Sequence, residues 1–194
     1  MAVVSIKNKL RRGNLLVGNE AYDPGGFYPI ATVTSTGSAG NITFNSIPGT
    51  YKHLQLRAMM RTNDTGTWNN QTLRLNSDSG ANYSFHQLYG NGTTVTALGN
   101  VSTTSFNDFM RAASDSLTSG IFGVAVIDIL DYADTNKHKT IRSLLGGDGN
   151  GNGFIGLHSG RWGSASAVTS ITILPSGGTA IANSTFALYG IKGA

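Results

Sequence analysis

Hydrophobic and polar residues alternate along much of this chain with the two-residue period of β-strands. The clearest segment is residues 51–62, where Leu54, Leu56, Ala58 and Met60 fall on one face and mostly polar residues on the other. Clusters of Gly, Asn, Ser and Pro separate such segments. The predicted strands are residues 27–34, 41–46, 51–62, 72–76, 82–89, 94–98, 121–132, 138–145, 153–160, 168–174 and 184–191.

Two segments depart from simple alternation. Residues 121–132 are almost continuously apolar, which predicts a central strand covered on both faces. Residues 105–115 fit either a strand or a single amphipathic helix of about two turns, because four apolar residues recur at helical spacing. These four residues are Phe106, Phe109, Met110 and Ala113.

Composition supports a fold built from strands and turns. The chain has 26 Gly among 194 residues, a single Glu (Glu20) and only 12% charged residues, so it lacks the straight-chain charged residues that fill exposed helix faces. It also has no Cys, which excludes disulfides and thiolate metal sites. We therefore expect an all-β fold with a β-sandwich or jelly-roll-like body.

The positive charge is confined to one end of the chain. Residues 1–19 carry four basic and no acidic residues, whereas residues 20–194 carry ten of each. The neutral body lacks the basic face that binds phosphates, so we expect no nucleic-acid partner. A Pro-Gly-Gly hinge ends at Gly26, which divides the chain into an N-terminal anchoring arm and hinge, residues 1–26, and a body, residues 27–194.

The basic arm has two interpretations. Its charges can simply solvate a flexible tail, or the arm can dock on another subunit with its apolar residues against the partner and its cations near acidic groups. We favour docking. The candidate partner-binding residues are Ile6, Lys7, Lys9, Leu10, Arg11, Arg12, Leu15 and Leu16.

A Gly- and Asn-rich segment at residues 146–153 suggests a weak calcium-loop candidate. Asp148, Asn150 and Asn152 match the alternating oxygen ligands of an EF-hand loop. However, the position of the closing bidentate carboxylate is Ser159, and the flanking segments alternate like strands. We therefore expect a structural hairpin loop, with no bound metal or cofactor.

Signatures of catalysis and of membrane insertion are missing from the sequence. The four histidines are scattered singly, no Gly-x-Ser-x-Gly motif occurs, and most Asp residues lie in turn-like contexts. We therefore expect no enzymatic activity, although a catalytic triad can still assemble in space. The longest apolar candidate for a membrane span, residues 121–130, is too short and includes Asp128, so we expect no membrane contact.

The two tryptophans are candidates for ligand contact. Trp68 and Trp162 lie in segments rich in Gly, Asn and Ser, where an exposed ring can stack on a host surface glycan. The same surroundings suit a ring that caps the core or one that lies in a subunit interface. All three interpretations remain open from the sequence.

Several strings resemble known proteins. Residues 46–57 (SIPGTYKHLQLR), residues 186–193 (FALYGIKG), and the N-terminal residues 5–9 and 15–19 are similar to segments of small structural and tail-fibre-like proteins of aquatic tailed bacteriophages, including cyanophages. The resemblance implies a virion protein with a jelly-roll-like body. It supplies no catalytic residues, because that family is defined by assembly.

Together these observations predict a virion structural protein. We expect a fibre- or tail-associated display module that the arm docks to other virion proteins, and that forms a homo-oligomer, with a trimer as the first expectation. The alternatives are a capsid decoration protein and a glycan-binding receptor-recognition module. A polysaccharide depolymerase would require two carboxylates that converge in a groove.

Overall fold

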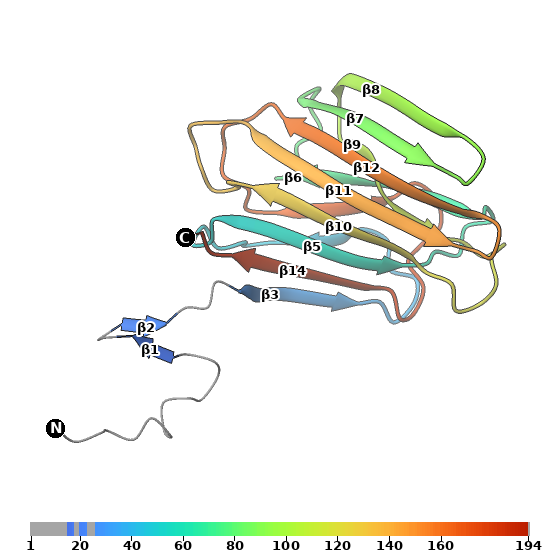
Figure 1. The fold of residues 1–194 in the computed structure, drawn as a ribbon, viewed down its shortest axis with the longest axis horizontal. Coiled ribbons are helices and arrows are strands. Elements are labelled where there is room, and N and C mark those ends of the chain that lie inside the picture. The colour runs from blue at the N-terminus through green and yellow to red at the C-terminus, as the bar shows by residue number, and fades with distance from the viewer. Residues whose placement is uncertain (1–14, 18–19, 23–25, 194) are drawn as a thin grey trace.

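The protein body is a β-sandwich. The structure is a computed structural model that describes the backbone of Leu15–Val17, Glu20–Tyr22 and residues 26–193, and the side chains of residues 26–193. Every regular element in these residues is a β-strand, which confirms the predicted all-β class. Strands β1 (Leu15–Val17) and β2 (Glu20–Tyr22) form a two-stranded sheet apart from the two sheets of the body (Figure 1).

The larger sheet has eight antiparallel strands, with β5 and β10 paired near its middle. Both edge strands, β3 and β8, have one neighbour each. In spatial order the strands are β3 (Phe27–Thr34), β14 (Thr185–Ile191), β5 (His53–Met60), β10 (Gly123–Leu130), β11 (Lys139–Asp148), β12 (Gly153–Trp162), β7 (Tyr83–Gly90) and β8 (Val95–Thr103).

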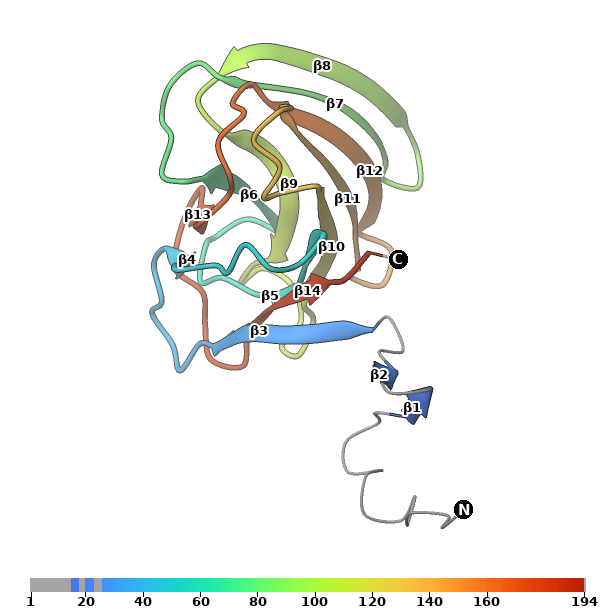
Figure 2. The same ribbon diagram turned by 90° about the vertical axis from the view of Figure 1, so that its left-hand side faces the viewer.

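The smaller sheet has four strands and lies against one face of the larger sheet, which curves past it (Figure 2). In spatial order its strands are β4 (Ile42–Phe44), β13 (Ile171–Pro175), β6 (Trp68–Leu75) and β9 (Phe106–Ala113). Strand β9 of the smaller sheet contacts β10 and β11 of the larger sheet.

The core lies between the two sheets. On β5 the predicted alternation is confirmed, because Leu54, Leu56, Ala58 and Met60 are all buried. The predicted pairing of residues 184–191 within a sheet is also confirmed, since β14 lies between β3 and β5. Edge-to-face and tilted contacts join rings from both sheets, in particular those of Tyr83, Phe85, Phe106 and Phe109.

Within residues 105–115 the chain forms strand β9 (Phe106–Ala113), so the helical alternative is wrong. A backbone irregularity explains the misleading pattern. Asp108 has a positive φ of 60°, and the pairing of β9 with β6 shifts register nearby. The bulge places Asp108, Phe109 and Met110 all in buried positions, so apolar residues recur at three- and four-residue intervals without a helix.

The prediction that residues 121–132 form a strand covered on both faces is wrong for β10. It lies near the middle of the larger sheet, as expected, but only one of its faces is covered. Ala125, Ile127 and Ile129 are buried, whereas Val124 and Val126 are exposed. The continuous apolar run therefore reflects an apolar surface on the outer face of the sheet, rather than burial on both sides.

Some strand boundaries also differ from the prediction. Strand β3 spans the predicted residues 27–34, but β6 begins four residues early, at Trp68, and β8 continues to Thr103. The expected loop at residues 146–153 is much shorter, since β11 runs to Asp148 and β12 begins at Gly153. The small and polar residues in these segments have a low propensity for strands. They are nevertheless part of strands, because the neighbouring strand supplies partners for their main-chain hydrogen bonds.

Candidate interaction surface

The face of the larger sheet that points away from the core carries a continuous row of large aliphatic side chains. Val126, Leu144, Leu157 and Leu88 are successive register partners across β10, β11, β12 and β7. Each has between 37% and 56% of its surface exposed. Side chains of direct register partners lie next to one another on one face of a sheet, so these four form one strip.

A second row runs parallel to the first and completes the patch. Met59 and Val124 are register partners, and beyond them Gly146 pairs with Ile155. Ile155 in turn pairs with Gly90. We call the two rows together the outer apolar face, which consists of Met59, Leu88, Val124, Val126, Leu144, Ile155 and Leu157.

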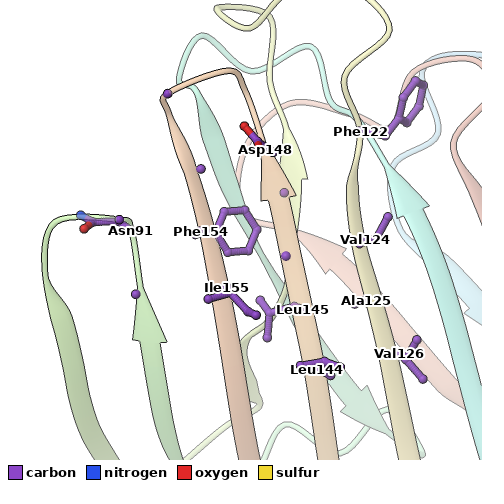
Figure 3. Close-up of a pocket in the computed structure, with 16 residues that line it drawn as sticks. Asn91, Phe122, Val124, Ala125, Val126, Leu144, Leu145, Asp148, Phe154 and Ile155 are labelled. Atoms are coloured by element: carbon purple, nitrogen blue, oxygen red, sulfur yellow. The ribbon is translucent and has the colours of Figure 1, made fainter.

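The glycines in the second row hollow the surface. A depression of about 760 Å³ lies where Gly146 and Gly90 present no side chains, and Val124, Leu144 and Ile155 line it (Figure 3). A second depression of about 520 Å³ lies farther across the sheet, beside Leu88 and Leu157 on one side and Arg142 and His86 on the other. Both depressions are open, so a convex apolar partner fits them better than an enclosed small molecule does.

A polar network borders the outer apolar face. The Gln55 amide donates a hydrogen bond to Asp128 at 2.8 Å, and the Arg57 guanidinium donates one to Gln55 at 2.8 Å. Arg142 lies 3.7 Å from the other oxygen of Asp128. These residues share one face of the sheet, since Gln55, Asp128 and Arg142 are successive register partners. An apolar centre with a polar rim is typical of protein interfaces.

The size of the patch is that of a protein contact. Seven large aliphatic residues, about half exposed on average, present on the order of 600 Å², which is the upper end of the range for a typical monomer. A standard interface buries roughly 800 Å² on each partner. The outer apolar face, with part of its polar rim, therefore has the dimensions of one side of a specific interface.

Most of the predicted anchoring arm cannot be placed. Ile6, Lys7, Lys9, Leu10, Arg11 and Arg12 lie outside the described residues. Leu15 and Leu16 belong to β1, where they pair with Tyr22 and Ala21 of β2. The docking role of the arm remains a prediction from the sequence.

The two tryptophans lie at strand ends, Trp68 at the start of β6 and Trp162 at the end of β12. Trp162 is 2% exposed and its indole donates a hydrogen bond to Asp78 at 2.7 Å, so its ring is not open to a glycan and the exposed interpretation is wrong for this residue. Trp68 is half-buried, packs edge-to-face on Phe154, and donates to Asn152 at 3.1 Å. Both rings close the core, which was one of the three interpretations.

The Gly- and Asn-rich segment forms the tight connection between β11 and β12. A carboxylate oxygen of Asp148 accepts a hydrogen bond from the backbone N–H of Asn150, and the side-chain oxygen of Asn152 accepts one from Trp68. Gly147 leaves room for Trp68, because a Cβ there would lie 2.4 Å from the indole. Two of the three candidate ligands therefore serve the turn and the indole.

Groups with catalytic potential are dispersed or engaged elsewhere. His158 is buried beside Ser143 in register, but the Ser143 hydroxyl donates to the carbonyl of Phe109 and Asp108 pairs with Arg111 at 2.5 Å. Within residues 26–193, no three His, Asp or Glu side chains gather as metal ligands. Among the same residues no helix is long and apolar enough to span a membrane.

Sequence reasoning missed the outer apolar face, although a signal was present. Val124 and Val126 on β10, and Ile155 and Leu157 on β12, occupy the alternate positions where an ordinary surface strand has polar residues. The signal becomes a surface only when β11 and β7 are placed beside these strands.

Comparison of the chain with protein-family models, with curated proteins and with solved structures found no match.

Proposed function

We propose that this protein is a non-catalytic structural module of a bacteriophage virion, which assembles with other virion proteins through the outer apolar face. The observation that carries the proposal is the pair of exposed aliphatic rows across β10, β11, β12 and β7. Covering these rows would stabilise a complex by roughly 25 cal/mol for each Å² of apolar surface removed from water. A module built for assembly benefits from such a surface.

The sequence resemblance supports the virion context. Residues 46–57 and 186–193 resemble segments of small phage structural proteins, and they include most of β5 and β14, which pair directly in the larger sheet. The two strings are thus neighbours in the fold. The neutral body and the basic arm fit a display module that the arm attaches to the particle.

A non-catalytic role agrees with how the reactive side chains are used. Ser143, Asp108 and Arg111 make hydrogen bonds and an ion pair within the core region, and His158 is shielded from solvent. A hydrolytic site needs a nucleophile and a base in contact at a surface that substrate can reach. These residues instead support the packing of β9 against the larger sheet.

The test is incorporation into particles. We expect mass spectrometry of purified virions to contain the wild-type protein, and Leu144→Lys to lower its incorporation by about tenfold or more, since an unpaired buried ammonium costs well over the 1.4 kcal/mol that a factor of ten represents. Leu144 is 56% exposed, so the variant should melt as wild type does.

The matched control is Thr140→Lys, four residues away on the same strand and at an exposed position outside the outer apolar face. It should incorporate normally. Absence of the wild-type protein from virions, or equal incorporation of both variants, contradicts the proposal. Imaging of labelled particles then assigns the protein to the tail, a fibre or the capsid, the last being the decoration alternative.

A further inference from the structure

Strand β8 is an edge strand with an open main-chain edge. It pairs with β7 alone, from Val95 opposite Gly90 to Thr103 opposite Tyr83. Figures 1 and 2 show it at the rim of the larger sheet, with none of the described segments beyond it. Its outward N–H and C=O groups are a ready template for another strand.

The edge strands of the two sheets differ in how far they are protected against the addition of another strand. Strand β3 contains Pro29, which lacks an N–H, and β4 has only three residues. Strand β9 carries Asp108 and Arg111 and a register shift. Charges, proline, bulges and short length are the usual devices that prevent edge pairing. Strand β8 spans nine residues without a charge or a proline, and its register shifts only near its C-terminal end, where Ser102 has a positive φ of 53°. Its residues 95–100 pair with β7 without a shift, so this part of the edge is the least protected.

The side chains of β8 are open on both faces of the sheet. Seven of its nine residues are exposed, and Val95 and Val101 are each 75% exposed. Ala97 pairs with exposed Leu88, while Leu98 pairs with buried Gln87 and is still 36% exposed. The smaller sheet therefore leaves β8 uncovered, so a partner can pack on both sides of the strand as well as along its edge.

We propose that β8 pairs with β8 of a second copy of this chain, antiparallel and about a two-fold axis, so that two eight-stranded sheets become one. Such strand addition is stabilised by main-chain hydrogen bonds and by contacts of exposed side chains such as Val95 and Val101. A two-fold axis makes the contact self-complementary, with each strand both template and addition.

Charge and edge chemistry select a second copy as the partner. Residues 20–194 carry ten basic and ten acidic residues, so the bodies of two copies meet without net repulsion, and the excess of four positive charges lies in residues 1–19. Strand β8 offers no charge that an acidic or basic partner could recognise. Pairing of β8 with β3 of another copy would form a ring, but Pro29 opposes it. The two-fold arrangement differs from the trimer expected from sequence.

This pairing is a separate proposal from the function above, although β8 adjoins the outer apolar face through the pairs Leu88–Ala97 and Gly90–Val95. One set of variants distinguishes the two proposals. We expect the full-length wild type to sediment as a dimer at the upper end of a concentration series of about a hundredfold. Val101→Lys should sediment as a monomer, since a charge on an edge strand opposes pairing. Its melting temperature should change little, because Val101 is mostly exposed.

The matched control for sedimentation is Leu144→Lys, which places the same charge on the outer apolar face and should leave the dimer intact. A wild-type monomer or trimer, or a Val101→Lys dimer, would overturn the inference. Loss of the dimer in Leu144→Lys alone would assign self-association to the outer apolar face instead.

Cysteine scanning locates the axis, and the chain suits it because it has no cysteine. Single variants Thr96→Cys, Leu98→Cys and Asn100→Cys should differ, since a disulfide needs Cα atoms about 4.4–6.8 Å apart and only positions near the axis meet their own copy. Thr32→Cys on β3 is the control and should not form a dimer. Equal cross-linking at Thr32 and throughout β8 would contradict a defined register.

Discussion

Two buried cations hold loops against the sandwich. The Arg61 guanidinium donates to the backbone carbonyls of Leu117, Thr118 and Ile121 at 2.8 to 3.1 Å, which closes the turn before β10. The Lys139 ammonium is fully buried and donates to the carbonyl of Lys137 at 2.8 Å, with two further carbonyls as acceptors. Burial lowers the pKa of Lys139. Hydrogen bonds to three carbonyls offset that loss of hydration.

A buried histidine, His158, makes the fold sensitive to pH below neutrality. His158 is 1% exposed and lies edge-to-face on Phe109, with Ser143 and Gln87 beside it in register. Burial lowers the pKa of His158 below its ordinary value of 6.5, and of the two charges on the facing strand β9, Asp108 opposes this shift while Arg111 adds to it. The ring is therefore neutral in the folded protein at pH 7.

We predict that acid destabilises the fold through His158. Above pH 6.5 both folded and unfolded chains hold it neutral, so it adds no pH dependence. As the pH falls below 6.5 the unfolded chain takes up a proton that the folded chain does not, and stability is lost until the pH reaches the lower, folded-state pKa. Urea unfolding midpoints at pH 7, 6 and 5 measure this loss.

The control variant for acid sensitivity is His158→Leu, which fills the site with an apolar side chain that cannot titrate. Its midpoint should change less than that of the wild type between pH 7 and 5, whatever its absolute stability. His53, His86 and His138 are less buried and remain in both proteins. Parallel curves for the two proteins would show that His158 does not cause the acid sensitivity.

At the scale of single elements, β10 carries apolar residues of the core on one face and apolar residues of the surface on the other. Ile127 is fully buried between the sheets, and the adjacent Val126 faces outward in the strip that contains Leu144 and Leu157. One strand thus contributes to the core and to the outer apolar face at alternate positions. This double use explains why its sequence resembles that of a strand buried on both sides.

We predict that Ile127→Ala lowers the free energy of unfolding by roughly 2–5 kcal/mol, because it leaves a cavity in a packed core. Val126→Ala should cost about 1 kcal/mol or less, since the lost side chain is partly in water already. Urea denaturation of the two variants measures both values. Similar losses for the neighbouring pair would contradict the assignment of the outward face.

At the scale of the whole molecule, three regions differ in chemistry and in place. The arm holds the excess positive charge, the outer apolar face is a broad aliphatic surface, and β8 is an uncharged edge. The polar rim that contains Asp128 and Arg142 borders the aliphatic surface, and β8 is the edge strand of the same sheet, next to Leu88 of that surface. The outer apolar face and the edge of β8 therefore adjoin one another.

We predict that deletion of residues 1–20 leaves a folded, dimeric body that no longer incorporates into particles. The core and β8 are both formed by residues after Gly26, so melting and sedimentation should match the full-length protein. A full-length variant with neutral residues in place of Lys7, Lys9, Arg11 and Arg12 tests whether charge or chain length matters. Normal incorporation of the deletion variant would remove the anchoring role of the arm.

The sequence by itself determined the strand content, the approximate strand positions, the inward residues of β5 and the neutrality of the body. These properties depend on local alternation and composition, which Leu54, Leu56 and the near absence of Glu already express. The burial of Trp162 and His158 was not predictable in this way, because Asp78 and Phe109 reach them from other strands.

Only the tertiary structure decided which apolar residues are core and which are surface. Ile127 and Val126 are equally hydrophobic in the sequence, and the position of the smaller sheet on one side alone distinguishes them. The outer apolar face likewise extends over five strands because β5 and β7, which are distant in sequence, pair with β10 and β12, and β8 is an edge because none of the other described strands pairs beyond it. Sheet order is set by long-range pairing, which local patterns do not encode.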